Sequence, residues 1–142
     1  MKLLTVPGIL ENLGAIRQFV NQTGREAGLS GQALYDLVLA VDELAANTVL
    51  YGYEQNRQPG NIVVTAKTSK TEFTVTLEDT APAFDPGKHN LPQDADLIQP
   101  MEERNIGGLG IYLAVKGVDG FKYQRIDQKN IVKLSKKLPP GS

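Results

Sequence analysis

The sequence predicts an α+β domain, a two-layer α/β sandwich in which helices cover one face of a mixed, mostly antiparallel sheet. Apolar residues recur with helical spacing over two stretches, from Leu10 to about Ala27 and from Gly31 to Tyr53. Apolar and polar residues alternate, as in strands, over residues 62–66 and 73–77. The order β-α-α-β-β, a long loop, then α-β-β is typical of helices packed on one side of a sheet.

Turn-forming residues bound the N-terminal elements. Residues 2–6 are expected to form an edge strand that ends at Pro7-Gly8. Gly28 stops the first helix, and Ser30 can cap the second with its side chain. The second helix is expected to end around Gly52, before a polar turn.

The C-terminal half contains a hairpin, a long loop and a final strand pair. Residues 69–71 can turn the hairpin, and a loop without periodicity follows, as in functional lids. We expect one domain over residues 1–138, with a lid at about 85–106 and a flexible tail at 139–142. Within it, a short helix is expected at 109–116 and strands at 120–126 and 130–138.

Composition excludes several classes of protein. The chain has 142 residues, of which 41% are hydrophobic and 22% charged, so it should fold as one domain. A net charge of -1 provides no basic field for nucleic acid or anionic lipid. No cysteine and a single histidine, His89, argue against disulfides, thiolate zinc sites and histidine-based metal sites or triads. No apolar run reaches the length of a membrane span, so we expect a cytoplasmic protein.

The second helix carries two polar residues on a mostly apolar surface. Glu43 and Asn47 lie four residues apart, so their side chains share one face. A carboxylate and an amide among apolar neighbours need partners. The spacing is very common, and taken alone it favours a solvated patch or a surface hydrogen bond.

Residues at two further places in the sequence could bind a ligand. Asp79 continues the apolar face of residues 73, 75 and 77, where it could accept a hydrogen bond from a buried amine; alternatively, the strand has ended and Asp79 lies in the turn before Pro82. Glycines at 107, 108 and 110 before a helix could let backbone N–H groups approach an anion, or could form a loop hinge.

In their order and spacing, these segments resemble a known family. Asp42-Glu43-Leu44-Ala45-Ala46-Asn47, followed by Tyr51-Gly52-Tyr53, resembles its N box. Asp79-Thr80-Ala81-Pro82-Ala83-Phe84-Asp85-Pro86 resembles its adenine-binding box, and Gly108-Leu109-Gly110-Ile111 its glycine box. The chain therefore resembles bacterial anti-sigma-factor serine/threonine kinases of the GHKL superfamily, which have the Bergerat fold.

The resemblance implies roles for individual residues. Asn47 would bind Mg²⁺, Glu43 would act as general base, and Asp79 would bind the adenine amine of ATP. The lid would cover the nucleotide, and the glycines would close on its phosphates. The implied nucleotide-binding residues are Asn47, Asp79, Ala81, Phe84, Arg104, Gly107, Gly108, Leu109 and Gly110.

Three departures from the family pattern stand out. Ala81 replaces a usual glycine, which restricts the backbone and could weaken the adenine contact. Tyr51 replaces a usual histidine. Asn105-Ile106 stands where these kinases often have a basic residue, and the nearest cation is Arg104. A displaced cation bears on phosphoryl transfer more than on ATP binding.

Three functions follow as hypotheses. The first is an ATP- and Mg²⁺-dependent serine/threonine kinase, expected as a homodimer, that phosphorylates an anti-sigma-factor antagonist (STAS-type) and sequesters a sigma factor by partner switching. The second is a nucleotide-binding regulatory module that transfers no phosphate. The third is a detached histidine-kinase catalytic domain, which the lack of a preceding dimerisation helix with a phosphoacceptor histidine argues against.

Overall fold

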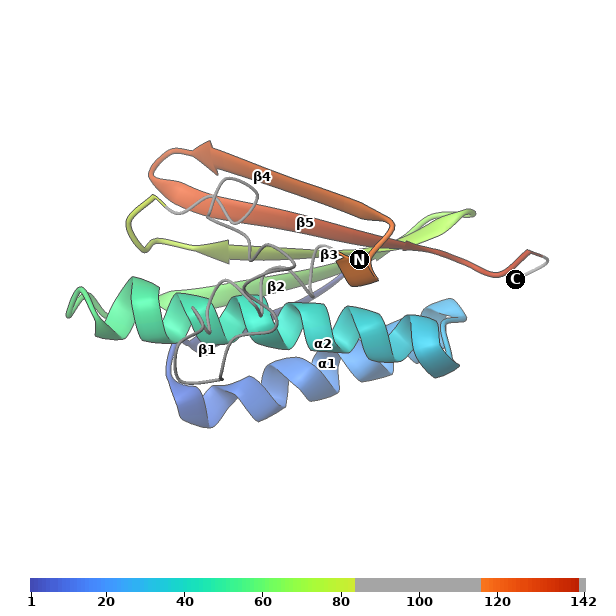
Figure 1. Ribbon diagram of the computed structural model, residues 1–142, viewed down its shortest axis with the longest axis horizontal. Helices are drawn as coiled ribbons and strands as arrows, with labels where there is room; N and C mark the ends of the chain where they lie inside the picture. The colour runs from blue at the N-terminus through green and yellow to red at the C-terminus, as the bar shows by residue number, and fades with distance from the viewer. Residues whose placement is uncertain (84–115, 141–142) are drawn as a thin grey trace, which may run out of the picture.

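Two helices cover one face of a five-stranded sheet (Figure 1). The computed structural model describes residues 1–83 and 116–140. Helices α1 (Leu13–Ala27) and α2 (Gly31–Asn47) lie side by side; α1 packs against β1, β2 and β3, and α2 packs against β5. The strands are β1 (Lys2–Pro7), β2 (Asn61–Thr68), β3 (Glu72–Asp79), β4 (Gly120–Ile126) and β5 (Lys129–Lys137).

The sheet has the strand order β1-β2-β3-β5-β4, so the C-terminal hairpin adds to β3 through its second strand. Every pairing between these described strands is antiparallel. The predicted α+β sandwich is confirmed, and the sheet is more regular than the expected mixed one.

The ends of the helices differ from the sequence prediction in three places. Residues Leu10–Asn12 form a 3₁₀ turn, η1, before α1 begins. Ser30 occupies the N-cap position of α2, but its side chain makes no capping hydrogen bond, so the expected side-chain cap is wrong. The second helix does continue past Asn47, but as a π-helical segment, η2, over Thr48–Glu54.

Two other predicted segments fall on undescribed residues. The expected lid over 85–106 lies outside the described residues. Most of the helix expected at 109–116 does too, although Lys116 and Gly117 are helical.

The hydrophobic core lies between the two layers. It is built from the inward faces of both helices and of the central strands, and its fully buried side chains include Ile16, Val20, Leu37, Val41, Val64, Phe73, Val75 and Leu134. Burying each such side chain contributes about 1.5–3 kcal/mol relative to leaving it exposed. The core therefore holds α2 firmly against the sheet, and α2 positions the site described below.

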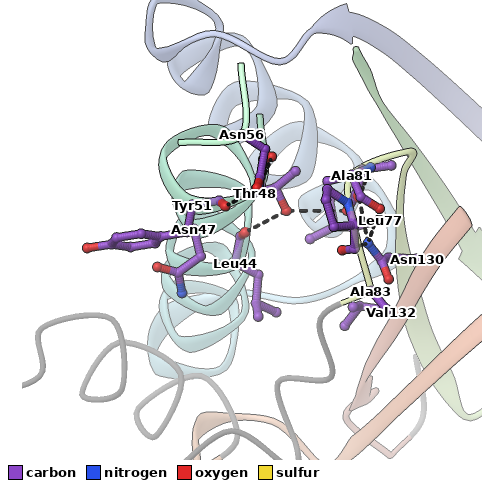
Figure 2. Close-up of a pocket in the computed structure, with 13 residues that line it drawn as sticks. Leu44, Asn47, Thr48, Tyr51, Asn56, Leu77, Ala81, Ala83, Asn130 and Val132 are labelled. Atoms are coloured by element: carbon purple, nitrogen blue, oxygen red, sulfur yellow. Dashed lines mark hydrogen bonds between the residues drawn. The ribbon is translucent and has the colours of Figure 1, made fainter. Parts of the chain in front are cut away.

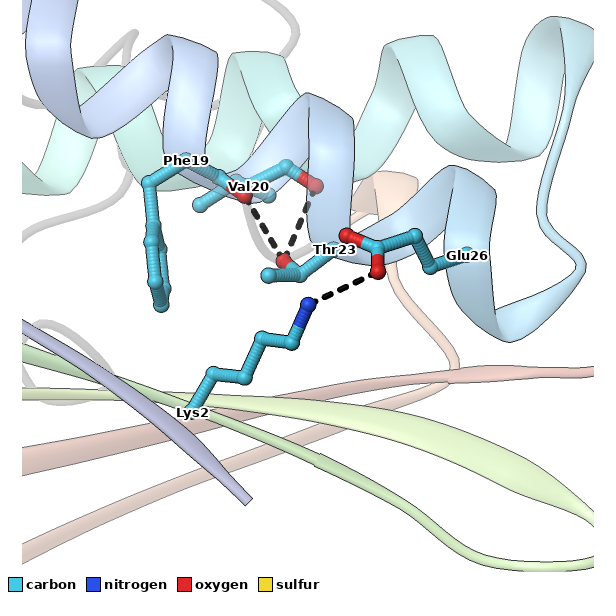
Figure 3. A network of polar contacts seen from close by, with 5 residues as sticks. All are labelled: Lys2, Phe19, Val20, Thr23 and Glu26. Atoms are coloured by element: carbon cyan, nitrogen blue, oxygen red, sulfur yellow. Dashed lines mark hydrogen bonds and ion pairs between the residues drawn. The ribbon is translucent and has the colours of Figure 1, made fainter.

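One end of the sheet is joined to α1 by an ion pair, beside a hydroxyl that bonds within α1 (Figure 3). The Lys2 ammonium lies 2.7 Å from the Glu26 carboxylate, and the Thr23 hydroxyl donates to the backbone oxygen of Phe19 at 2.8 Å. Because the ion pair is solvent-exposed, it contributes only about 0.2–1 kcal/mol. In the strand register, Lys2 lies at the opposite end of the sheet from Asp79. Among residues 1–83 and 116–140, no helix has both the length and the apolar character to cross a membrane.

Candidate functional site

A cavity of about 130 Å³ lies between the end of α2, η2 and the ends of β3 and β5. This volume is close to the roughly 150 Å³ of a cavity that binds benzene, so the space is comparable in size to a single aromatic ring. One part of its wall is apolar and another is polar. The apolar side chains are Leu44, Leu77 and Val132, and the polar ones include Thr48, Asp79 and Asn130.

Asp79 is the carboxylate of this cavity. It is the last residue of β3 and is buried, so the alternative that the strand has already ended is wrong. Its Oδ1 accepts hydrogen bonds from the Ala81 backbone N–H and from the Asn130 side-chain amide, each at 2.9 Å. The Thr48 hydroxyl lies 3.4 Å from Oδ2. Burial raises the pKa of Asp79, and these hydrogen bonds and the charge of Arg125 oppose the rise.

Asn130 was missed in the sequence analysis. It pairs with Asp79 across β3 and β5, and only 3% of it is exposed. The signal was available, because Asn130 shares a strand face with Val132 and Leu134, as Asp79 does with Leu77. Its amide nitrogen also donates to the backbone oxygens of Ala81 and Pro82, both at 3.1 Å. Asn130 thus joins the end of β3 to the segment that follows it.

Ala81 fits this backbone. It is buried and lines the cavity, and it is not among the described residues with positive φ, so alanine adopts the conformation without strain. The space for its methyl group comes from Gly52, where an added Cβ would lie 2.8 Å from the Ala81 Cβ. The methyl group therefore packs on η2, and the expected backbone restriction does not arise.

The π-helical segment η2 positions Tyr53 beside the residue that follows β3. The Tyr53 hydroxyl donates to the Asn61 backbone oxygen at 2.6 Å and accepts from the Thr80 backbone N–H at 2.9 Å. Its ring lies so close to Gly60 that a Cβ there would be 2.6 Å from the ring. Short π-helical segments within helices are frequent at functional sites. Here the segment ties down the peptide that follows Asp79.

Asn47 lies on the α2 side of the cavity. It is buried, and its side-chain nitrogen makes no hydrogen bond to any described residue. Figure 2 shows its amide on the same side of the helix as Tyr51, whose ring points away from Asn130. A buried amide with an unused hydrogen-bonding group is expected to meet a further polar partner.

Glu43 lies one helical turn before Asn47 and is half-buried. It is not among the residues that line the cavity in the described part of the chain. Partial burial raises the pKa of Glu43, and the neighbouring charge of Asp42 raises it further. Asp42 itself turns to the outer surface, where it pairs with Arg17 at 2.8 Å.

The structure therefore brings Asn47, Asp79 and Ala81 to one cavity, with Glu43 close by in the sequence of the same helix. The other predicted nucleotide-binding residues lie outside the described residues; they are Phe84, Arg104, Gly107, Gly108, Leu109 and Gly110.

The fold is that of an ATPase-type domain. Residues 6–136 match the family of the histidine kinase-like ATPase domain, and the chain belongs to that family. It is also similar to the serine-protein kinase RsbW of Listeria monocytogenes and to RsbW of Listeria innocua. Each is 26% identical over 126 residues, which cover 84% of this chain and 76% of the relative. The family that the three motifs indicated is thereby confirmed.

Proposed function

We propose that this chain binds ATP with Mg²⁺ and transfers its γ-phosphoryl group to a serine or threonine of a protein partner. The observation that carries the proposal is the ring-sized cavity that ends in the buried Asp79 carboxylate and lies beside the buried Asn47 amide. A carboxylate facing an apolar cavity suits the exocyclic amine of adenine. The similarity to two serine-protein kinases supports phosphoryl transfer to serine.

The donors near the cavity fit a magnesium ion that is shared with a nucleotide. No cluster of three or more acidic or histidine residues that could hold a metal alone occurs in residues 1–83 and 116–140. Mg²⁺ prefers oxygen ligands and usually takes few from protein, with water and phosphate supplying the rest. The Asn47 amide oxygen would provide such a ligand, and the ion would neutralise charge on the phosphates.

Glu43 would accept the proton of the attacking hydroxyl or orient that hydroxyl. A general base acts in its deprotonated form, and a raised pKa brings a carboxylate closer to the basicity that proton transfer at neutral pH requires. The rest of the catalytic effect would come from positioning and charge stabilisation, which dominate phosphoryl transfer.

By the same proposal, the partner that accepts phosphate is an anti-sigma-factor antagonist of the STAS type. The unphosphorylated antagonist would compete with a sigma factor for a homodimer of this chain. This step rests on the resemblance of the motifs and on the similarity to RsbW.

Calorimetry with ATP, with and without Mg²⁺, tests the proposal together with transfer of labelled phosphate to the antagonist. We expect binding that Mg²⁺ strengthens and label on serine or threonine. For Asn47→Ala we expect an unchanged fold and loss of the Mg²⁺-dependent part of the affinity; equal affinity in wild type and variant would contradict the site.

Binding without label on the partner would instead favour a regulatory module that uses nucleotide as an effector. This second function is supported by Glu43, which is not among the described residues that line the cavity. Label on a histidine of a partner would indicate a histidine-kinase catalytic domain.

A further inference from the structure

Three polar residues lie next to one another across the sheet behind the cavity. Asp79 on β3 is paired with Asn130 on β5, and Asn130 is paired with Arg125 on β4. Cross-strand partners on one face have Cβ atoms about 4.5–5.5 Å apart, so their side chains interact directly. The row runs from the exposed Arg125 at the sheet edge inward to the buried carboxylate.

The two outer residues determine which way the Asn130 amide points. Its oxygen accepts hydrogen bonds from the Tyr123 hydroxyl at 2.7 Å and from the Arg125 guanidinium at 3.0 Å. A guanidinium only donates, so it requires the amide oxygen on its own side. The amide nitrogen is then turned toward Asp79, where it donates to Oδ1 at 2.9 Å. The reversed amide would place an oxygen against the carboxylate, which has no proton to donate when ionised.

Arg125 also fixes the segment after Asp79. Its guanidinium donates to the Ala81 backbone oxygen at 3.2 Å, and Asn130 donates to the same oxygen at 3.1 Å. The Ala81 N–H in turn donates to Asp79 Oδ1. Oδ1 is thus occupied by two donors, whereas Oδ2 has the longer contact of 3.4 Å with the Thr48 hydroxyl.

We propose that Arg125, Asn130 and Tyr123 form a brace that holds the Asp79 carboxylate and makes the cavity selective for a purine with a 6-amino group. The proposal rests on the proposed function, since it deepens the binding of adenine at Asp79. The brace occupies Oδ1 and leaves Oδ2 as the acceptor for an amine. These are positioning residues, because they act on the ligand through Asp79.

The titratable groups around the carboxylate support this division of roles. Arg125 and Tyr123 lie on β4 and bond to Asn130, the neighbour of the carboxylate, and Tyr53 on η2 bonds to the Thr80 N–H. Arg125 is the positively charged member of this set, and its charge favours the ionised form of Asp79.

The experiment compares ATP with purine riboside triphosphate, which lacks the 6-amino group but has the same ring and phosphates. Affinities are measured by calorimetry for the wild type and for Arg125→Met. We expect the wild type to prefer ATP about tenfold or more, since a hydrogen bond to a charged group is lost with the analogue. In Arg125→Met we expect the ratio of the affinity for ATP to that for the analogue to fall at least fivefold, because ATP binds more weakly. The affinity for the analogue should change less than twofold, once the effect of the lost charge is subtracted with the control variant described below.

Lys122→Met is the matched control, because Lys122 is an exposed cation of the same strand on the opposite face of the sheet. It removes the same charge and should retain the full preference for ATP. Any general effect of a lost positive charge on triphosphate binding is read from this variant and cancels in the ratio of the two nucleotides. Tyr123→Phe removes one donor to the Asn130 oxygen and should reduce the preference in the same direction, by less.

The outcomes separate the two proposals. If the wild type prefers ATP and Arg125→Met shows the same preference, the brace is wrong and the proposed function is unaffected. Equal weakening of both nucleotides in Arg125→Met also overturns the brace, since a structural or charge effect does not distinguish the 6-amino group. A wild type that binds neither nucleotide overturns the proposed function and the brace together.

Discussion

Removing a single oxygen atom tests how the cavity is held in place. In Tyr53→Phe the ring and its packing remain, and only 3% of Tyr53 is exposed, so no new space opens for solvent. The hydroxyl that accepts from the Thr80 N–H and donates to the Asn61 oxygen is lost. Two backbone groups then lose their partner at the site where β3 ends and β2 begins.

The size of the effect follows from those two bonds. An unsatisfied buried polar group costs about 1–3 kcal/mol, and partial access to water places both groups near the lower limit. We therefore expect a loss of about 2 kcal/mol in the free energy of unfolding. For a domain of this length that corresponds to a fall in Tm of about 6–8 °C.

The same substitution should weaken nucleotide binding, because Thr80 lies between Asp79 and Ala81. We expect a loss of about tenfold in ATP affinity. At an ATP concentration of 100 times the wild-type Kd, ligand stabilisation would fall from about 2.7 to about 1.4 kcal/mol. Thermal unfolding with and without ATP measures both effects on the same samples.

Tyr51→Phe is the matched control, two residues away in the same segment. Tyr51 is 46% exposed, and no described residue is hydrogen-bonded to its hydroxyl. Its loss should change the free energy of unfolding by less than about 0.5 kcal/mol. If the two variants unfolded at the same temperature, Tyr53 would not be holding the Thr80 peptide.

Three further predictions concern the charge and the packing of the cavity. In Asp79→Asn, ATP affinity should fall about 10- to 100-fold because an acceptor becomes a donor. The ligand-free variant should be at least as stable as the wild type at pH 7. Because the pKa of Asp79 is raised in the folded state, its stabilising contribution is complete below the unfolded-state pKa near 3.8 and is lost as pH rises through the folded-state pKa. Urea unfolding at pH 4 and pH 7 would measure this loss. In Glu43→Gln, the rate of transfer of labelled phosphate should fall about 10²–10⁴-fold, while ATP binding is retained. The rate of the wild type should rise with pH through a pKa above 4.5. The same pH profile in the wild type and the variant would refute the role of Glu43 as the base. Gly52→Ala should cost about 1–3 kcal/mol by contact with Ala81, and Ala81→Gly in the same chain should restore most of it, as a double-mutant cycle in urea would determine.

The fold could be predicted well from the sequence because its periodicities are long and regular. The alternation over residues 62–66 and 73–77 identified β2 and β3, and the same alternation placed Asp79 on the buried face. Helical spacing identified both helices. What spacing could not predict is the change to π-helical geometry at Thr48, since the apolar pattern runs through it without interruption.

The candidate site was predicted only where a residue departs visibly from an apolar pattern. Asp79 and Asn47 do so within their own elements. Asn130 meets Asp79 through strand pairing between β3 and β5, 51 positions apart in the chain, and Arg125 joins them from β4. Pairing partners follow from the order of strands in the sheet, which the sequence order did not indicate. Ala81 departs from the family pattern when its position is considered alone. In the structure, the missing side chain of Gly52 leaves the space that the Ala81 methyl group occupies.

The two polar ends of the site lie on either side of a change in helical geometry. In α2 the regular spacing keeps Glu43 and Asn47 on one face, which suits an ion and phosphates. After Asn47, the backbone bonds lengthen to i→i+5, as in the bond from the Gln55 N–H to the Leu50 oxygen. The Thr48 N–H still bonds to Leu44 as in an α-helix, and its hydroxyl contacts Asp79. The wider turn that follows shifts the phase of the helix, and Tyr53 reaches Thr80. A helix that stayed regular to Glu54 would not present Tyr53 at the same angle. In the proposed function, the segment after Asn47 would therefore support the base-binding end of the cavity, while α2 would supply the side chains near the ion and the phosphates.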